Sequence, residues 1–173
     1  MKLKNNNLFL IGPMGAGKSS VGRYLAKQLD MDFYDTDEEI EKRTGVDIAW
    51  IFDLEGEGGF RQREAGVVAE LVQLNHIVLA TGGGSILEPE NRELLSRFGT
   101  VIYLEVSLPY QHDRTINESR RPLLRVDNKQ DVLVKLMHER EPLYLSIADF
   151  RVSTDERSVR AVADDVLQWL DET

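Results

Sequence analysis

The stretch Gly12-Pro13-Met14-Gly15-Ala16-Gly17-Lys18-Ser19 matches the pattern G-x-x-x-x-G-K-S/T at every fixed position. It follows an apolar run at 8–11 and opens a segment with helical spacing at 18–29, which is the strand–loop–helix context of a P-loop. The glycines let the backbone wrap an anion with its N–H groups turned inward, and the helix N-terminus adds positive potential. We therefore predict a nucleoside triphosphate site with Mg²⁺, in which Lys18 meets the β- and γ-phosphates and Ser19 meets the metal.

The composition is that of a globular chain, with 173 residues of which 42% are hydrophobic and 29% charged. This length predicts a single domain over 1–173. The chain has no cysteine, which excludes disulfides, thiolate catalysis and cysteine-based zinc sites. Its three histidines are far apart in sequence, and no metal site made only of protein ligands is evident.

The charge and hydropathy patterns restrict the possible partners. A net charge of −9 repels phosphate backbones, so we expect no nucleic-acid partner. No apolar run approaches the roughly 18 residues of a membrane-spanning helix, and the run at 8–11 is too short for a signal peptide. We expect no membrane partner and a cytoplasmic location, which agrees with the absence of cysteine.

Apolar runs and helical spacing alternate along the chain. Helical patterns occupy 18–29, 66–74 and 158–170, and another helix is expected to begin at Pro89. Strands that alternate with helices imply βαβ units, and therefore an α/β fold with a mainly parallel sheet covered on both faces. The predicted strands are 8–11, 32–35, 77–80, 101–104 and 150–152.

The segment 112–125 departs from the acidic character of the chain. Pro122 disfavours helix at Arg121, so a helix that begins near 107–109 is expected to end before an arginine-bearing loop. This loop is either a solvated surface loop or a binding loop for a ligand that carries phosphate. The segment holds Arg114, Arg120, Arg121 and Arg125 against Asp113 and Glu118, a net charge of +2.

Two short patterns suggest a GTP-binding switch as an alternative. Asp53-Leu54-Glu55-Gly56 fits D-x-x-G, and Asn128-Lys129-Gln130-Asp131 fits the guanine-reading pattern N-K-x-D. Each pattern needs a strand before it. Asp47 instead predicts a helix cap before the first pattern, and a proline and charges precede the second.

A small-molecule kinase is the other interpretation, and it begins with Asp35-Thr36-Asp37 after the predicted strand 32–35. In an extended backbone the carboxylates of Asp35 and Asp37 would face the same way at the ligand-binding edge of the sheet. One would hold Mg²⁺ through water, and the other would accept a proton from a hydroxyl. The structural alternative is a capping box made by Thr36 and Glu39.

Glycines and arginines supply further candidates for the acceptor site. Gly82, Gly83 and Gly84 follow the strand 77–80, where a bare backbone would let a ligand approach its N–H groups, although a flexible turn is the alternative. Arg61 has acidic neighbours at i−4 and i+3, which favours a surface ion pair. Arg140 has no acidic neighbour at helical spacing, so its partner is either a substrate anion or a stack on Tyr144.

Six stretches occur in the order typical of shikimate kinases, and the chain resembles this family over nearly its whole length. The P-loop alone is widespread, whereas the set DTD, FR..E, GGG and RPLL is far more specific. Ser20 stands where many members have Thr. Because it lies beyond the metal-binding hydroxyl of Ser19, we expect no consequence from this difference. The stretches are GPMGAGKSS (12–20), YDTDEEIEKRTG (34–45), FR..E (60–64), LATGGG (79–84), R......RPLL (114–124) and ER.PLY (139–144).

The resemblance implies transfer of the γ-phosphoryl of ATP to the 3-hydroxyl of shikimate, a step of aromatic amino-acid biosynthesis. It also implies an adenylate-kinase-like P-loop kinase with a five-stranded parallel sheet, a mobile lid at about 116–128 and an acceptor-binding region at about 35–64. A monomer is expected. Another small-acid kinase, such as a gluconate kinase, is the nearest rival, because two arginines for one carboxylate would serve either acceptor.

The resemblance also assigns roles by position. Lys18, Asp37 and Arg121 would be catalytic, with Asp37 as the candidate base and Arg121 reaching the phosphates from the lid. Ser19 would bind Mg²⁺ directly and Asp35 through water. The expected ATP-binding residues are Gly12, Met14, Gly15, Ala16, Gly17, Lys18, Ser19, Ser20, Arg121 and Arg114, the last stacked on adenine. The expected acceptor-binding residues are Asp37, Arg61, Gly82, Gly83, Gly84 and Arg140.

Overall fold

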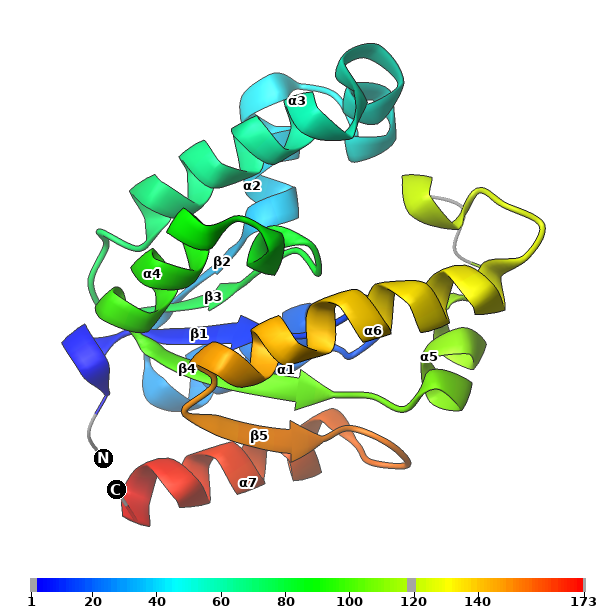
Figure 1. Cartoon of the computed structure of the whole chain (residues 1–173). Coiled ribbons are helices and arrows are strands. Elements are labelled where there is room, and N and C mark those ends of the chain that lie inside the picture. Colours follow the sequence, from blue (N-terminus) through cyan, green and yellow to red (C-terminus); the bar gives the residue numbers. More distant parts are fainter. Residues whose placement is uncertain (1–2, 118–120, 173) are drawn as a thin grey trace.

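Five strands form one parallel sheet in the order β2-β3-β1-β4-β5 (Figure 1). The structure is a computed structural model that describes residues 3–117 and 121–172. The expected five-stranded parallel sheet is confirmed, and β1 lies at its centre. The strands are β1 (Leu8–Ile11), β2 (Asp32–Asp35), β3 (Ile77–Ala80), β4 (Thr100–Glu105) and β5 (Phe150–Ser153).

Helices connect the strands and begin close to where the sequence predicts them. The main difference is α3, a longer element that begins after the predicted cap Asp47 and ends at Leu71, so the predicted helix 66–74 covers only its last residues and runs past its end. Gly56, with a φ of 69°, breaks α3 into two helical parts. Within the described residues, no helix is long and apolar enough to cross a membrane. The helices are α1 (Lys18–Leu29), α2 (Thr36–Thr44), α3 (Ile48–Leu71), α4 (Pro89–Phe98), α5 (Leu108–Thr115), α6 (Lys129–Ile147) and α7 (Val159–Glu172).

The sheet separates two apolar cores, because alternate residues of each strand face opposite sides. In β1, Leu8 and Leu10 pack with Val21 and Leu25 of α1 and with residues of α7. The intervening Phe9 and Ile11 pack with residues of α2, α3, α4 and α6. All four residues of β1 are buried, as expected for a central strand with helices on both faces.

The two patterns that suggested a GTP-binding switch have other roles in the fold. Asp53 lies inside α3, and Gly56 is the break in that helix, so no strand precedes D-x-x-G. Asn128 is the N-cap of α6, where its side-chain oxygen accepts a hydrogen bond from the backbone N–H of Asp131 at 3.3 Å. Both patterns therefore belong to helical segments, the first inside α3 and the second at the N-terminus of α6.

The described part of the expected lid includes a 3₁₀ turn at Pro122–Leu124. Leu124 is buried against Met14 and Leu133, which joins this turn to the P-loop and α6. Arg125 forms an exposed ion pair with Asp53 of α3 at 3.4 Å. Residues 118–120 lie outside the described residues, so the lid at 116–128 stays a prediction.

Candidate active site

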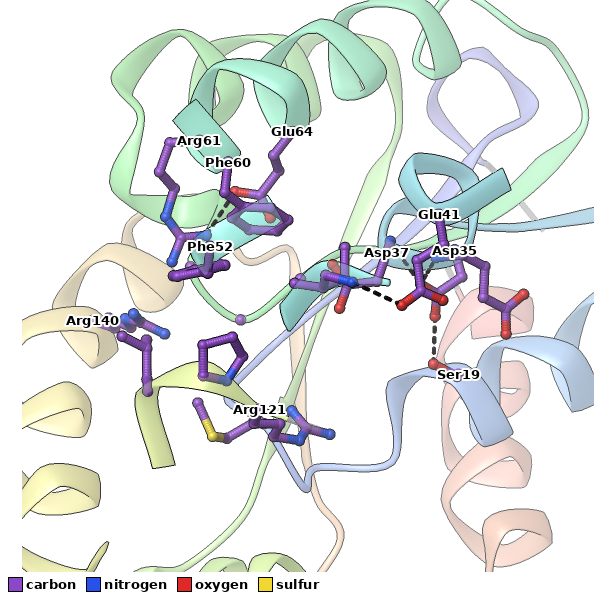
Figure 2. Close-up of a pocket in the computed structure, with 18 residues that line it drawn as sticks. Ser19, Asp35, Asp37, Glu41, Phe52, Phe60, Arg61, Glu64, Arg121 and Arg140 are labelled. Atoms are coloured by element: carbon purple, nitrogen blue, oxygen red, sulfur yellow. Dashed lines mark hydrogen bonds and ion pairs between the residues drawn. The ribbon is translucent and has the colours of Figure 1, made fainter. Parts of the chain in front are cut away.

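Loops from the carboxyl ends of β1, β2 and β3 meet at one edge of the sheet, where open α/β sheets bind ligands. They enclose a cavity of about 370 Å³, which is within the size range of small-molecule sites. Arg61 and Arg140 lie on one side of the cavity, and Asp35 and Ser19 lie on the other (Figure 2). An apolar wall is formed by Ile48, Phe52 and Phe60, and Met14, Asp37, Gly82, Gly83, Gly84 and Arg121 also line the cavity.

The P-loop is held open by side chains that bond its carbonyl groups. Gly12, Gly15 and Gly17 all have positive φ, which explains glycine at these positions. The buried Lys18 ammonium donates to the carbonyls of Gly12 and Pro13 at 2.7 and 2.8 Å. From α5, Gln111 and Arg114 donate to the next two carbonyls, those of Met14 and Gly15, at 2.9 and 3.0 Å. Sequence reasoning missed Gln111, because only the packing of α5 on the loop reveals its role.

Ser19 and Asp35 provide hard oxygen ligands at the start of α1. The Ser19 hydroxyl donates to Oδ2 of Asp35 at 2.5 Å, so both oxygens already occupy one small region. No group of three or more His, Cys, Asp or Glu in the described part of the chain could hold a metal alone. Two oxygens nevertheless suit Mg²⁺, which takes its remaining ligands from phosphates and water.

Asp35 is also the N-cap of α2, and this corrects two expectations. Its Oδ1 accepts hydrogen bonds from the N–H groups of Asp37 and Glu38 at 2.9 and 3.2 Å. Since α2 begins at Thr36, the carboxylates of Asp35 and Asp37 do not share a face through strand alternation, and Thr36 is not the cap. The first turn of the helix brings the two carboxylates together instead, so both line the cavity.

Buried charges shift the titration of the two central groups. Removal from water raises the pKa of Asp37 to about 7, and the negative charges of Asp35 and Glu64 act in the same direction. Burial also lowers the pKa of Lys18 to about 7, helped by the positive charge of Arg121. A phosphate would restore the charged form of Lys18. The raised pKa makes the Asp37 carboxylate a better acceptor for the proton of a reacting hydroxyl.

Arg61 is held by a buried ion pair rather than by the exposed pair that its sequence neighbours suggested. Its guanidinium donates to Glu64 at 2.8 Å, and the Glu64 side chain is 1% exposed. A weaker contact joins Arg61 to Glu57 at 3.2 Å. Glu64 has one buried carboxylate oxygen without a hydrogen-bond partner among the described residues. This pair therefore presents a fixed positive group to the cavity.

The glycine loop 82–84 makes room for that pair. A Cβ on Gly84 would lie 2.1 Å from a guanidinium nitrogen of Arg61, and one on Gly82 would lie 2.6 Å from Oε2 of Glu64. We expected the amide of Gly82 to be available to a ligand. It donates instead to the Thr36 hydroxyl at 2.9 Å. The glycines are thus required for close packing as well as for any contact with a ligand.

Arg140 of α6 is 3% exposed and faces the same cavity. No carboxylate of the described residues forms an ion pair with it, in agreement with the sequence argument. A stack on Tyr144, the alternative to a substrate anion, is not found among the cation–π contacts of the described residues. The positive charge of Arg140 acts instead on the neighbouring Tyr144 phenol, whose pKa it lowers against the effect of burial. A buried cation of this kind is a ready partner for a ligand carboxylate.

A second hollow of about 240 Å³ lies on the other side of the P-loop. Arg114 lines it and donates to the carbonyl and hydroxyl of Thr154 at 2.8 and 3.0 Å. Arg157, which sequence reasoning missed, is fixed there by an ion pair with Asp165 at 2.6 Å. Gly15, Ala16, Gly17 and Ser20 complete the wall on the P-loop side.

A P-loop that opens onto a cavity with two arginines and a high-pKa carboxylate defines a P-loop kinase for a small anionic acceptor. The comparisons with known proteins identify the family. The shikimate kinase family model matches residues 14–171. Relatives named shikimate kinase from Francisella tularensis subsp. novicida and Legionella pneumophila are 56% and 54% identical, each over 97% of this chain and 96% of the relative.

A solved structure agrees with these relatives. The shikimate kinase from Acinetobacter baumannii in complex with shikimate is 45% identical and superposes with a TM-score of 0.94, over 96% of this chain and 93% of that one. The chain belongs to the shikimate kinase family.

Proposed function

We propose that this protein transfers the γ-phosphoryl group of ATP to the 3-hydroxyl of shikimate, giving shikimate 3-phosphate and ADP. The observation that carries the proposal is the placement of Arg61, Arg140 and Asp37 around one cavity at the mouth of the P-loop. Family membership supports the choice of acceptor, because the solved A. baumannii relative was obtained in complex with shikimate.

The acceptor binds through its carboxylate in this proposal. Arg61 and Arg140 pair with that group, while Asp37 contacts the hydroxyls on the side nearer the P-loop. Phe52 and Phe60 cover the apolar part of the ring. Gly83 and Gly84 complete the acceptor site, and Gly82 contributes to its wall. This orientation directs a hydroxyl of the acceptor toward the phosphates.

The nucleotide occupies the P-loop and the second hollow. Amides of residues 12–20 and Lys18 hold the phosphates, Arg121 adds positive charge, and Arg114 meets the adenine. Because phosphoryl transfer has a largely dissociative transition state, Lys18 and Arg121 contribute more to the rate than early proton removal by Asp37. Asp37 orients the hydroxyl and accepts its proton late in the reaction.

Ser19 and Asp35 would hold Mg²⁺, Ser19 directly and Asp35 through water. When bound, the ion neutralises charge on the β- and γ-phosphates. We further propose a cytoplasmic monomer; the described residues of one chain line both cavities. The chain would work as a single kinase domain, with a lid at about 116–128 that excludes water and an acceptor-binding region at about 35–64.

The test is coupled ADP release by the purified protein with Mg²⁺ and ATP. Strong stimulation by shikimate, with none by gluconate and little turnover of GTP, is the expected result. Stimulation by gluconate alone would assign the cavity to a different hydroxy acid. Slow GTP turnover without a response to either acceptor would overturn the kinase assignment and favour the GTP-binding switch.

A further inference from the structure

Tyr144 contacts two parts of the acceptor cavity without lining it. It lies on α6, one turn after Arg140, and is 1% exposed. Its hydroxyl donates to the Gly83 carbonyl at 2.5 Å, and the positive charge of Arg140 acts on the same phenol. This hydrogen bond ties α6, the helix that carries Arg140, to the glycine loop after β3.

The Gly83 peptide and the Arg140 guanidinium are close neighbours in the cavity wall. A Cβ on Gly83 would lie 3.6 Å from Nη1 of Arg140 and 3.2 Å from the backbone nitrogen of Met14. A small shift of the Gly83 peptide would therefore move the guanidinium, whereas the P-loop is held by its own hydrogen bonds. Arg140 faces the cavity opposite Ser19 and Asp35 (Figure 2), so its position helps to set the orientation of an acceptor.

Arg140 has few other constraints on its position. Its Nε is buried and has no hydrogen-bond partner among the described residues, and no carboxylate there forms an ion pair with it. Arg61 is different, because two glutamates hold its guanidinium. The Gly83 peptide, which Tyr144 holds, therefore constrains Arg140 where glutamates constrain Arg61.

Tyr144 is itself held rigidly by the sheet. Its ring stacks on Tyr103 of β4 with centroids 5.1 Å apart and an interplanar angle of 23°. Tyr103 is 1% exposed, so the ring pair is enclosed between β4 and α6. Burial raises the pKa of the Tyr144 phenol well above its usual value, so the hydroxyl stays protonated and can donate its hydrogen bond to the Gly83 carbonyl.

We propose that Tyr144 is a positioning residue for the acceptor site, whose hydroxyl holds the Gly83 carbonyl and so fixes the peptide against which the Arg140 guanidinium lies. The inference rests on the proposed function, in which Arg140 binds the acceptor carboxylate. Tyr144 acts through these two groups and touches no substrate. Its loss would weaken acceptor binding selectively, while the P-loop would keep its own hydrogen bonds from Lys18, Gln111 and Arg114.

The experiment compares two identical chemical changes in one ring pair. Tyr144→Phe removes the hydroxyl and keeps the stack, whereas Tyr103→Phe removes the hydroxyl of the other ring. We expect Tyr144→Phe to raise the KM for shikimate about tenfold, through the loss of the hydrogen bond that holds the Gly83 peptide, with the KM for ATP within about twofold. Tyr103→Phe should leave both KM values within about twofold of the parent. Thermal unfolding establishes that each variant is folded.

A double variant separates positioning from general loosening. In an Arg140→Ala background, adding Tyr144→Phe should change the KM for shikimate by less than about twofold, because the group that it positions is already absent. Calorimetric titration of the unliganded proteins with shikimate gives the same comparison without turnover. An unchanged KM for shikimate in Tyr144→Phe, or an equal rise of both KM values, would overturn the inference. A parent protein that does not respond to shikimate would instead contradict the proposed function.

Discussion

Replacing Gly84 by alanine tests the packing between the glycine loop and Arg61. A Cβ at this position would lie 2.1 Å from a guanidinium nitrogen, 2.4 Å from Cζ and 2.5 Å from the other terminal nitrogen. Ordinary contact needs about 3.5 Å, so the guanidinium must retreat by about 1.4 Å. The clash involves the far end of a flexible side chain and not the backbone, so the fold should survive the change.

The displacement should affect the acceptor far more than the nucleotide. Misplacing Arg61 would remove a charge-assisted hydrogen bond to the acceptor carboxylate, an effect of about 1.5–3 kcal/mol. This corresponds to a rise of roughly 10- to 150-fold in the KM for shikimate, if that KM follows binding. The KM for ATP should stay within about twofold of the parent, because residues 82–84 do not line the hollow assigned to the nucleotide base.

Steady-state kinetics with either substrate varied, together with thermal unfolding, is the assay. Gly66→Ala is the matched control, because Gly66 lies on the exposed side of α3 and a Cβ there would meet nothing within 4 Å. That control should be neutral or slightly stabilising. The reasoning is refuted by a Gly84→Ala protein that folds with an unchanged KM for shikimate, or by one whose two KM values rise together.

Three further predictions concern the phosphate side of the cavity. Lys18→Ala should abolish ADP release, while Lys27→Ala on the exposed side of the same helix should not; near-normal kcat in Lys18→Ala would refute the P-loop assignment. Arg121→Ala should lower kcat with a milder effect on the KM for shikimate, and the opposite pattern would place Arg121 in the acceptor site. For Asp37, a pKa of about 7 in the folded chain against 3.8 unfolded means that folding stability is lost as pH rises from about 4 through 7, by at most about 4 kcal/mol. Asp37→Asn should remove this loss. Denaturant unfolding should therefore show the variant to be more stable than the parent at pH 8 and similarly stable at pH 4. An equal pH dependence of stability in both proteins would contradict the raised pKa of Asp37.

Periodicity and apolar runs predicted most of the sheet and its covering helices. The runs at 8–11 and 77–80 became β1 and β3 without change, because buried parallel strands consist of continuous apolar residues. The helix start after the Asp47 cap was predicted and is confirmed, but the break at Gly56 and the helix beyond it were harder to predict, since a glycine-rich stretch inside a helix contradicts local propensity. Contacts with α2 and the sheet keep this segment helical.

The candidate site could be predicted only where local sequence carries the chemistry. The P-loop is such a case, because strand, glycines and lysine are contiguous. The roles of Gln111 and Thr154 were not predictable, since each depends on contacts with residues distant in the sequence. The packing of Gly84 against Arg61 is similar, because a run of glycines does not reveal which side chain fills the space beside it.

Asp35 serves two purposes with its two oxygen atoms, and this limits which residues can replace it. Oδ1 caps α2, and Oδ2 accepts from Ser19 at the proposed metal position. Asparagine caps helices as well as aspartate does, so Asp35→Asn should keep the melting temperature near that of the parent while activity falls. Alanine would lose both uses at once, and glutamate would carry its carboxylate one methylene too far for the cap. The position is therefore under two independent selective constraints, and only a residue with a short side chain and a negative charge satisfies both.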